Sequence, residues 1–245
     1  MAASLADFVV KSLPASTAAE LSEYAMALRH ACDASRAPYA LTEFGRRFRV
    51  LARDPSWFAN LLVSDAHLEG YSAWQLWKWS ESIADVRVRE SVERHATDEA
   101  RHSRMFASLL RILFPHACTD DVGLRLAAMS PDLIPNDDRT RPTTEAAVPD
   151  DVLRSLAFIN TFEAKALVLG RLLEPVLVAY ASPSDTRRVE RIARALLADE
   201  VRHIAYSAHI LQRASDHGRD DVVRAALREA HASLNASTSA ELEAL

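Results

Sequence analysis

The sequence D-E-A-R-H at residues 98–102 returns as D-E-V-R-H at residues 199–203, so one five-residue motif stands twice in a chain of 245 residues. In a helix, a glutamate and a histidine three positions apart project from the same face, about one turn apart. Both side chains can therefore reach a metal ion on that side of the helix. The repeated motif predicts two helices that each offer Glu-x-x-His to the protein interior.

Each motif lies in the middle of an apolar stripe with helical spacing, over residues 88–113 and 192–214. Two further predicted helices, at 55–82 and 150–180, each carry a single glutamate within such a stripe: Glu69 and Glu163. A carboxylate buried among apolar side chains is costly unless a positive group compensates its charge. These positions are therefore candidates for metal ligands.

The spacing of the glutamates fits two antiparallel helical hairpins. The midpoint between Glu69 and Glu99 falls where two apolar stripes meet, and the midpoint between Glu163 and Glu200 falls in the turn expected at 180–185. Residues equally far from a turn face each other across a hairpin, so each pair is predicted to lie side by side. A bundle that binds a carboxylate-bridged metal pair uses two Glu-x-x-His helices and one glutamate from each of two further helices. Two hairpins joined by a crossover would supply all six ligands.

Composition predicts an all-α fold, because only five glycines occur among abundant Ala, Leu, Arg and Glu. We expect one helical domain over residues 1–245: accessory helices in 1–54, a four-helix bundle in 55–217 and a last helix in 219–245. The proline-rich segment 115–149 fits a single long crossover, with a short helix near 121–129.

The net charge of −5 argues against nucleic-acid binding, and no apolar run is long enough to cross a membrane. The N-terminal residues lack the pattern of a signal peptide, so we expect a cytoplasmic protein. Two cysteines, Cys32 and Cys118, favour reduced, structural thiols.

Together, these motifs resemble the ferritin-like non-haem di-iron carboxylate superfamily, over about residues 55–114 and 150–217. The resemblance implies a ferritin-like bundle in which each metal ion has one histidine and the ions share bridging carboxylates. The implied ligands are Glu69, Glu99, His102, Glu163, Glu200 and His203.

The full D-E-x-R-H form is similar to the hydroxylase subunits of bacterial multicomponent monooxygenases, although this chain is far shorter. The similarity implies that the aspartate of each motif orients the histidine of the other motif, and that the arginines hold these carboxylates. A ligating imidazole usually donates its other N–H to such a carboxylate. The residues concerned are Asp98, Arg101 and His102 in the first motif and Asp199, Arg202 and His203 in the second.

His95, one turn before Glu99, is either a seventh ligand or a buried core histidine. The first alternative resembles the additional histidine of p-aminobenzoate N-oxygenase, which lies on the fourth helix, where this chain has Leu196. Asp65, one turn before Glu69, is either a supplementary ligand or the partner of an arginine.

Several aromatic and basic residues leave a structural and a functional interpretation open. Tyr71 and Tyr206 fit packing or a hydrogen-bonding role near the metals. All four tryptophans lie in 57–79, where core filling and a homodimer interface account for them. The arginines of 46–53 fit a solvated helix face, with a docking patch for an acidic electron donor or a phosphorylated substrate as the alternative.

Carboxylate and imidazole ligands suit iron or manganese. The resemblance implies an O₂-dependent di-iron oxygenase or oxidase that hydroxylates, N-oxygenates or desaturates a small organic substrate. It implies two iron ions, with manganese or a mixed pair left open, O₂ as co-substrate and an external electron donor such as a ferredoxin or a reductase.

Two other classes stay open. One is a metal storage or carrier protein, and the other is a peroxide-scavenging protein similar to manganese catalase or rubrerythrin. A histidine for each metal and the Asp and Arg of each motif favour a fixed catalytic pair over storage.

Overall fold

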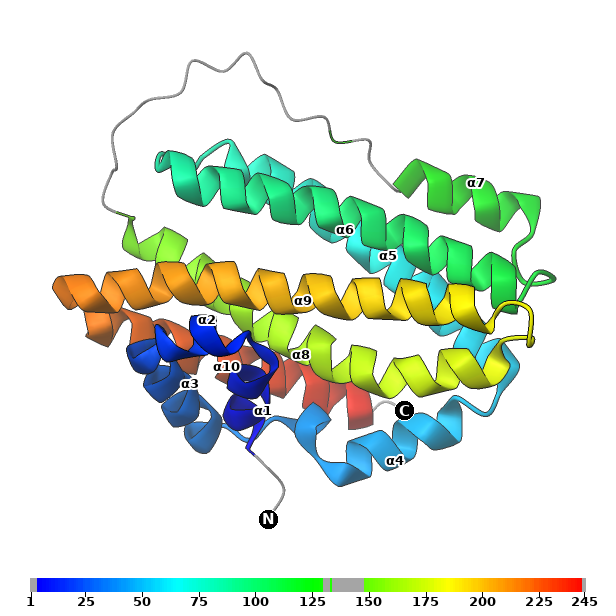
Figure 1. The fold of residues 1–245 in the computed structure, drawn as a ribbon, viewed down its shortest axis with the longest axis horizontal. Coiled ribbons are helices and arrows are strands. Elements are labelled where there is room, and N and C mark those ends of the chain that lie inside the picture. Colours follow the sequence, from blue (N-terminus) through cyan, green and yellow to red (C-terminus); the bar gives the residue numbers. More distant parts are fainter. Residues whose placement is uncertain (1–3, 130–132, 134–147, 244–245) are drawn as a thin grey trace. The chain divides into compact units, whose positions relative to one another are not determined.

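The computed structural model describes residues 4–129, 133 and 148–243, and within this part of the chain it contains helices and no strand (Figure 1). The predicted all-α class is confirmed. The α-helices are α1 (Leu5–Ser12), α2 (Ala15–Ala19), α3 (Ser22–Ala34), α4 (Thr42–Leu51), α5 (Pro55–Ser80), α6 (Val86–Leu113), α7 (Asp120–Met129), α8 (Asp150–Tyr180), α9 (Thr186–Ala214) and α10 (Asp220–Glu243). A 3₁₀ turn, η1 (Pro38–Ala40), and a π-helical turn, η2 (Ser215–Arg219), complete the list.

The long helices begin and end where the sequence has capping and breaking residues. At the start of α5, the Asp54 side chain accepts a hydrogen bond of 2.8 Å from the Ser56 N–H, and Pro55 occupies the first helical position. At the other end of the chain, Gly218 interrupts the helix between α9 and α10 with a φ of 79°, a conformation that favours glycine. None of the described helices is both long and apolar enough to cross a membrane.

Both predicted hairpin turns are present, between Ser80 and Val86 and between Tyr180 and Thr186. The short helix predicted near 121–129 is α7. The prolines and the Asn-Asp-Asp run predicted to break the crossover at 131–142 lie outside the described residues.

The chain forms two compact units, each made of segments that are separate in sequence. Unit 1 comprises residues 1–46, 148–171 and 197–245, and unit 2 comprises residues 47–147 and 172–196. The helices α8 and α9 contribute to both units. The expectation of one domain over 1–245 stays a prediction.

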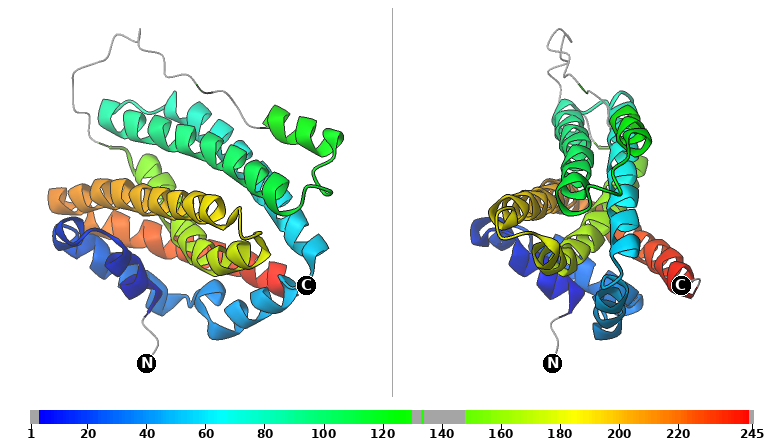
Figure 2. Two further views of the ribbon diagram at one scale, coloured as in Figure 1. Left: turned by 45° about the vertical axis from the view of Figure 1, so that its right-hand side comes forward. Right: turned by 90° about the vertical axis from the view of Figure 1, so that its right-hand side faces the viewer.

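In unit 2, α5 and α6 pack side by side along their length, and α7 packs against both helices (Figure 2). At one end of the pair, the rings of Phe58 and Tyr180 stack with centroids 5.2 Å apart, and Phe114 meets Tyr180 edge-on at 5.0 Å. The Tyr180 hydroxyl donates a hydrogen bond of 2.9 Å to the Ala52 carbonyl. Such aromatic pairs add about 0.5–1.5 kcal/mol each beyond the burial of their area.

In unit 1, α3 packs against α10, and α1 packs against α3 (Figure 2). Leu28 on α3 and Leu227 on α10 are fully buried in this core. On α8, Gly170 permits a close approach to α9, because a Cβ at this position would lie 2.8 Å from the Leu197 Cδ2 atom.

The α10 helix also buries His231 completely, and neither ring nitrogen has a hydrogen-bond partner in the described part of the chain. Burial disfavours the charged imidazolium and lowers the pKa of His231 from 6.5 to about 4. The folded protein therefore keeps His231 neutral at a pH at which the unfolded chain protonates it.

We predict that His231 makes the protein less stable as the pH falls. Above pH 6.5, the histidine is neutral in both states, and between pH 6.5 and about 4 only the unfolded state binds the proton. This difference costs about 3 kcal/mol once the pH has fallen to the folded-state pKa, at 1.36 kcal/mol per pKa unit. Urea unfolding of His231→Leu should show a smaller loss of stability over this range than the wild type. The exposed His116, replaced by Gln, is the control, and equal losses in all three proteins would contradict the prediction.

Candidate metal centre

The helix α6 presents the first motif to the interior of unit 2. Its register is set at the N-terminus, where the Asp85 side chain accepts a hydrogen bond of 2.9 Å from the Val88 N–H. Val92 and Phe106 lie on the buried face of the helix. At its centre, the same face carries His95, Glu99 and His102.

Glu69 from α5 joins this face. The His102 Nδ1 atom lies 3.4 Å from the Glu99 Oε1 atom and 3.8 Å from the Glu69 Oε2 atom. Glu69, Glu99 and His102 offer ligand atoms that all lie within 4.8 Å of one another. His102 is fully buried, and the Glu69 side chain is 17% exposed. Two carboxylates and one imidazole at this separation form a group that could hold a metal ion.

His95 lies next to this group. Its Nε2 atom is 3.4 Å from the Glu99 Oε1 atom, and its side chain is 1% exposed. His95 is therefore a buried neighbour of Glu99, as both sequence interpretations require, and the choice between ligand and core histidine stays a prediction.

The two carboxylates of unit 2 have opposite pKa shifts. Burial raises the pKa of Glu69, and the neighbouring Glu99 carboxylate raises it further, well above its usual range. Burial also acts to raise the pKa of Glu99, but the neighbouring Glu69, His102 and His95 side chains hold it well below its usual range. Glu69 is thus the carboxyl of the pair that holds a proton more readily, and Glu99 is the one that ionises more readily. A divalent cation bound here would displace that proton, as metal ligands generally require.

The second motif produces a similar arrangement in unit 1. The His203 Nδ1 atom lies 3.5 Å from the Glu163 Oε2 atom on α8 and 3.8 Å from the Glu200 Oε2 atom one turn earlier on α9. All three residues are buried. In each unit, one imidazole nitrogen thus lies close to a carboxylate oxygen of the glutamate in its own motif and to one of a glutamate on the neighbouring helix. We call these two groups the unit 2 triad (Glu69, Glu99, His102) and the unit 1 triad (Glu163, Glu200, His203).

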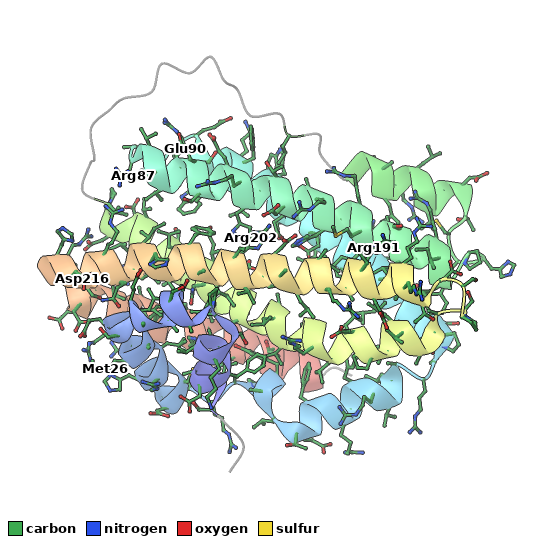
Figure 3. The ribbon with its side chains drawn as sticks, in the orientation of Figure 1. Met26, Arg87, Glu90, Arg191, Arg202 and Asp216 are labelled. Atoms are coloured by element: carbon green, nitrogen blue, oxygen red, sulfur yellow. The ribbon has the colours of Figure 1, made fainter. Side chains whose placement is uncertain are left out.

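The aspartate and arginine of each motif form an ion pair with each other. Arg101 Nη2 lies 2.6 Å from Asp98 Oδ1, and Arg202 pairs with Asp199 in the same way. The Asp199 side chain is 5% exposed, whereas that of Arg202, labelled in Figure 3, is 56% exposed. Each arginine therefore holds a carboxylate next to the metal-ligand positions. The orientation of each histidine by the opposite aspartate stays a prediction.

Asp65 and Tyr71 do not have the partners that the sequence suggested for them. Asp65 forms no ion pair with any described residue, and burial raises its pKa to about 7. The arginine partner considered for it is therefore wrong. The Tyr71 side chain is exposed and accepts a hydrogen bond from Gln75 rather than facing the triad. Trp74 is exposed beside it, while Trp57, Trp77 and Trp79 are partly buried.

The structure also reveals a polar network in unit 1 that the sequence interpretation missed. Ile159 on α8 is only partly buried, whereas the next residue, Asn160, is fully buried. Asn160 accepts a hydrogen bond of 2.8 Å from the Tyr24 hydroxyl. Its Nδ2 atom donates to Ser207 Oγ at 2.9 Å and to the Ile204 carbonyl at 3.2 Å.

This network is directly connected to the unit 1 triad. Asn160 precedes Glu163 by three residues on α8, and the Ser207 hydroxyl donates a hydrogen bond of 2.8 Å to the His203 carbonyl. The network therefore fixes α8 against α9 at the level of the triad. The sequence signal for this network was an asparagine three residues before Glu163, a spacing that places both side chains on one helix face.

No family model matches the chain, and neither a curated protein nor a solved structure matches it at a significant level.

We predict that Asn160→Leu destabilises the protein by about 1–3 kcal/mol, because the buried Tyr24 hydroxyl loses its acceptor while the side-chain volume changes little. Chemical denaturation measures the change. Asn60→Leu on the exposed face of α5 is the matched control and should alter stability by less than about 0.5 kcal/mol. Equal effects of the two substitutions would contradict a special role for Asn160.

We also predict that Asp199→Asn weakens metal binding by roughly 10–100-fold, the usual effect of losing a group that supports a metal ligand. Isothermal titration with Fe(II) under argon measures the affinity. The exposed pair of Asp121 and Arg125 provides the control, since Asp121→Asn removes a similar ion pair far from both motifs in sequence. An unchanged affinity in Asp199→Asn would show that this aspartate is merely a partner of Arg202.

Proposed function

We propose that this protein is an O₂-activating non-haem di-iron oxygenase or oxidase that acts on a small organic substrate. The observation that carries the proposal is the repetition of one constellation, in which a histidine meets the glutamate of its own motif and a glutamate of the neighbouring helix. Two such groups of the same composition, both in helical cores, are hard to explain as structural ion pairs, because buried charge is costly.

In this proposal each triad binds one iron ion. One imidazole and two carboxylates suit Fe(II) and Mn(II), and such sets leave coordination positions for O₂ or a substrate. The six ligands together follow the pattern of a carboxylate-bridged metal pair. The pairing of the two triads rests on this pattern and on the duplicated motif in the sequence.

The bound iron pair would supply the activation of O₂, and the residues of the chain have supporting tasks. Glu99 and His102 on α6, and Glu200 and His203 on α9, are held by regular helices and not by loops, which fixes their geometry. Asp98 and Asp199 directly precede Glu99 and Glu200 in sequence. Their ion pairs with Arg101 and Arg202 restrain these segments of α6 and α9. Five of the six ligand side chains are buried, which restricts the access of water to the site.

The reaction proposed is hydroxylation, N-oxygenation or desaturation, and its electrons would come from an external donor such as a ferredoxin or a reductase. A storage or carrier protein is the main alternative. One histidine and two carboxylates in each triad favour ions that stay bound, whereas the transit site of a storage protein has to release its ions.

We predict that the protein, reconstituted with excess Fe(II) under argon and desalted, retains about two iron ions per chain, as bundles with this ligand set do. His102→Ala and His203→Ala should each retain about one, because each removes the nitrogen ligand of one triad. His116→Ala, at an exposed position, should retain the wild-type amount. Atomic emission spectrometry measures the iron, and circular dichroism verifies that each variant is folded.

The same protein separates the enzyme from the storage interpretation. When it is supplied with repeated additions of Fe(II) in air, an enzyme should remain at about two ions per chain, whereas a storage protein accumulates iron with each addition. Accumulation of iron far beyond two ions per chain would refute the oxygenase proposal, even if all six ligands are correctly assigned. Retention of no iron by the wild type would refute the metal centre itself.

A further inference from the structure

A second candidate site lies in unit 2, and of its lining residues only Arg101 also has a part in the metal proposal. There, α6 and the first turns of α9 enclose an open cavity of about 430 Å³. Arg188 on α9 donates a hydrogen bond of 3.5 Å to Ser108 on α6, which marks the approach of the two helices. Cavities of roughly 300–1,000 Å³ are typical of small-molecule sites.

The charge of this cavity is opposite to that of the chain. Four of its lining residues are arginines, and none is acidic, while the chain as a whole has a net charge of −5. The arginines are Arg101, Arg104, Arg188 and Arg191. Asp98 offsets Arg101, but neither Arg188 nor Arg191 forms an ion pair with a described residue. Figure 3 shows Arg191 on the side of α9 that faces α6.

The position of these arginines is unfavourable for the helix itself. Arg188 and Arg191 lie in the first two turns of α9, whose first turn has no acidic residue. The helix dipole places partial positive charge at an N-terminus, so cations there are repelled and acidic residues are preferred. A bound anion would stabilise both the arginines and the helix end.

The remaining lining residues restrict the chemistry of the ligand. Met105, Ile192 and Ala195 give the cavity an apolar part next to the guanidinium groups. A guanidinium binds a carboxylate or a phosphate through two parallel hydrogen bonds. An apolar wall adds affinity in proportion to the apolar surface that it covers.

We propose that this arginine cavity binds a small organic anion, with its carboxylate or phosphate held by Arg188 and Arg191 and its apolar body against Met105 and Ile192. The size of the cavity suits such a molecule and is too small for a protein partner. This inference goes beyond the proposed function and does not depend on metal in either triad.

The test compares four probes on the full chain by isothermal titration calorimetry: hexyl phosphate, hexanoate, inorganic phosphate and hexanol. At least one of the two amphipathic anions should bind at least tenfold more tightly than inorganic phosphate, and hexanol should show no binding. Raising the salt from 50 to 500 mM NaCl should weaken the anion, because the attraction is between exposed charges.

The double substitution Arg188→Gln with Arg191→Gln should weaken the anion at least tenfold. The matched control is Arg187→Gln with Arg194→Gln, which removes two exposed arginines from the same helix outside the cavity and should leave binding unchanged. Circular dichroism establishes that both variants are folded. Binding of hexanol as tight as that of the anions, equal losses in the two variants, or no binding of either organic anion would overturn the proposal.

Discussion

Charge buried within helical cores is the constraint on which this structure depends. Glu99 lies in a stripe of apolar side chains, yet the neighbouring Glu69, His102 and His95 side chains hold the pKa of its carboxyl well below the usual range. A buried ion costs several kcal/mol when such partners are absent. The helices that carry these residues must therefore keep one register, because a shift of one residue would move the Glu99 carboxylate away from these partners.

Much of the fold could be predicted because the sequence repeats its pattern with the helical period. The turn after Tyr180 and the capping residue Asp54 mark helix ends through local chemistry, which needs no knowledge of tertiary structure. Glu69 and Glu99 are equally far in sequence from the turn of their hairpin, which predicted that they face each other. The structure places Glu69 3.8 Å from His102. Local periodicity and hairpin geometry were sufficient for that part of the site.

Other features depend on residues that are distant in sequence, and no local pattern reveals them. Tyr24 reaches Asn160 across 136 positions, so the reason for burying an asparagine on α8 lies in another helix. The arginine cavity combines residues of α6 with residues of α9. The arginines of 46–53, which are conspicuous in the sequence, do not line this cavity, and one of them, Arg46, pairs with the exposed Glu43. Whether Asp65 has an arginine partner could likewise not be read from its own helix.

The hydrogen bond between Tyr24 and Asn160 also affects how the chain is made. Residues leave the ribosome in order, so α3 emerges long before α8, and Tyr24 has no acceptor until most of the chain has been synthesised. The two glutamates of the unit 2 triad, by contrast, belong to one hairpin and can meet early. Contacts between near neighbours in sequence form faster than distant ones. The residues of the two triads, alike in composition, are thus brought together at different times of synthesis, with the unit 2 hairpin complete before α8 and α9 emerge.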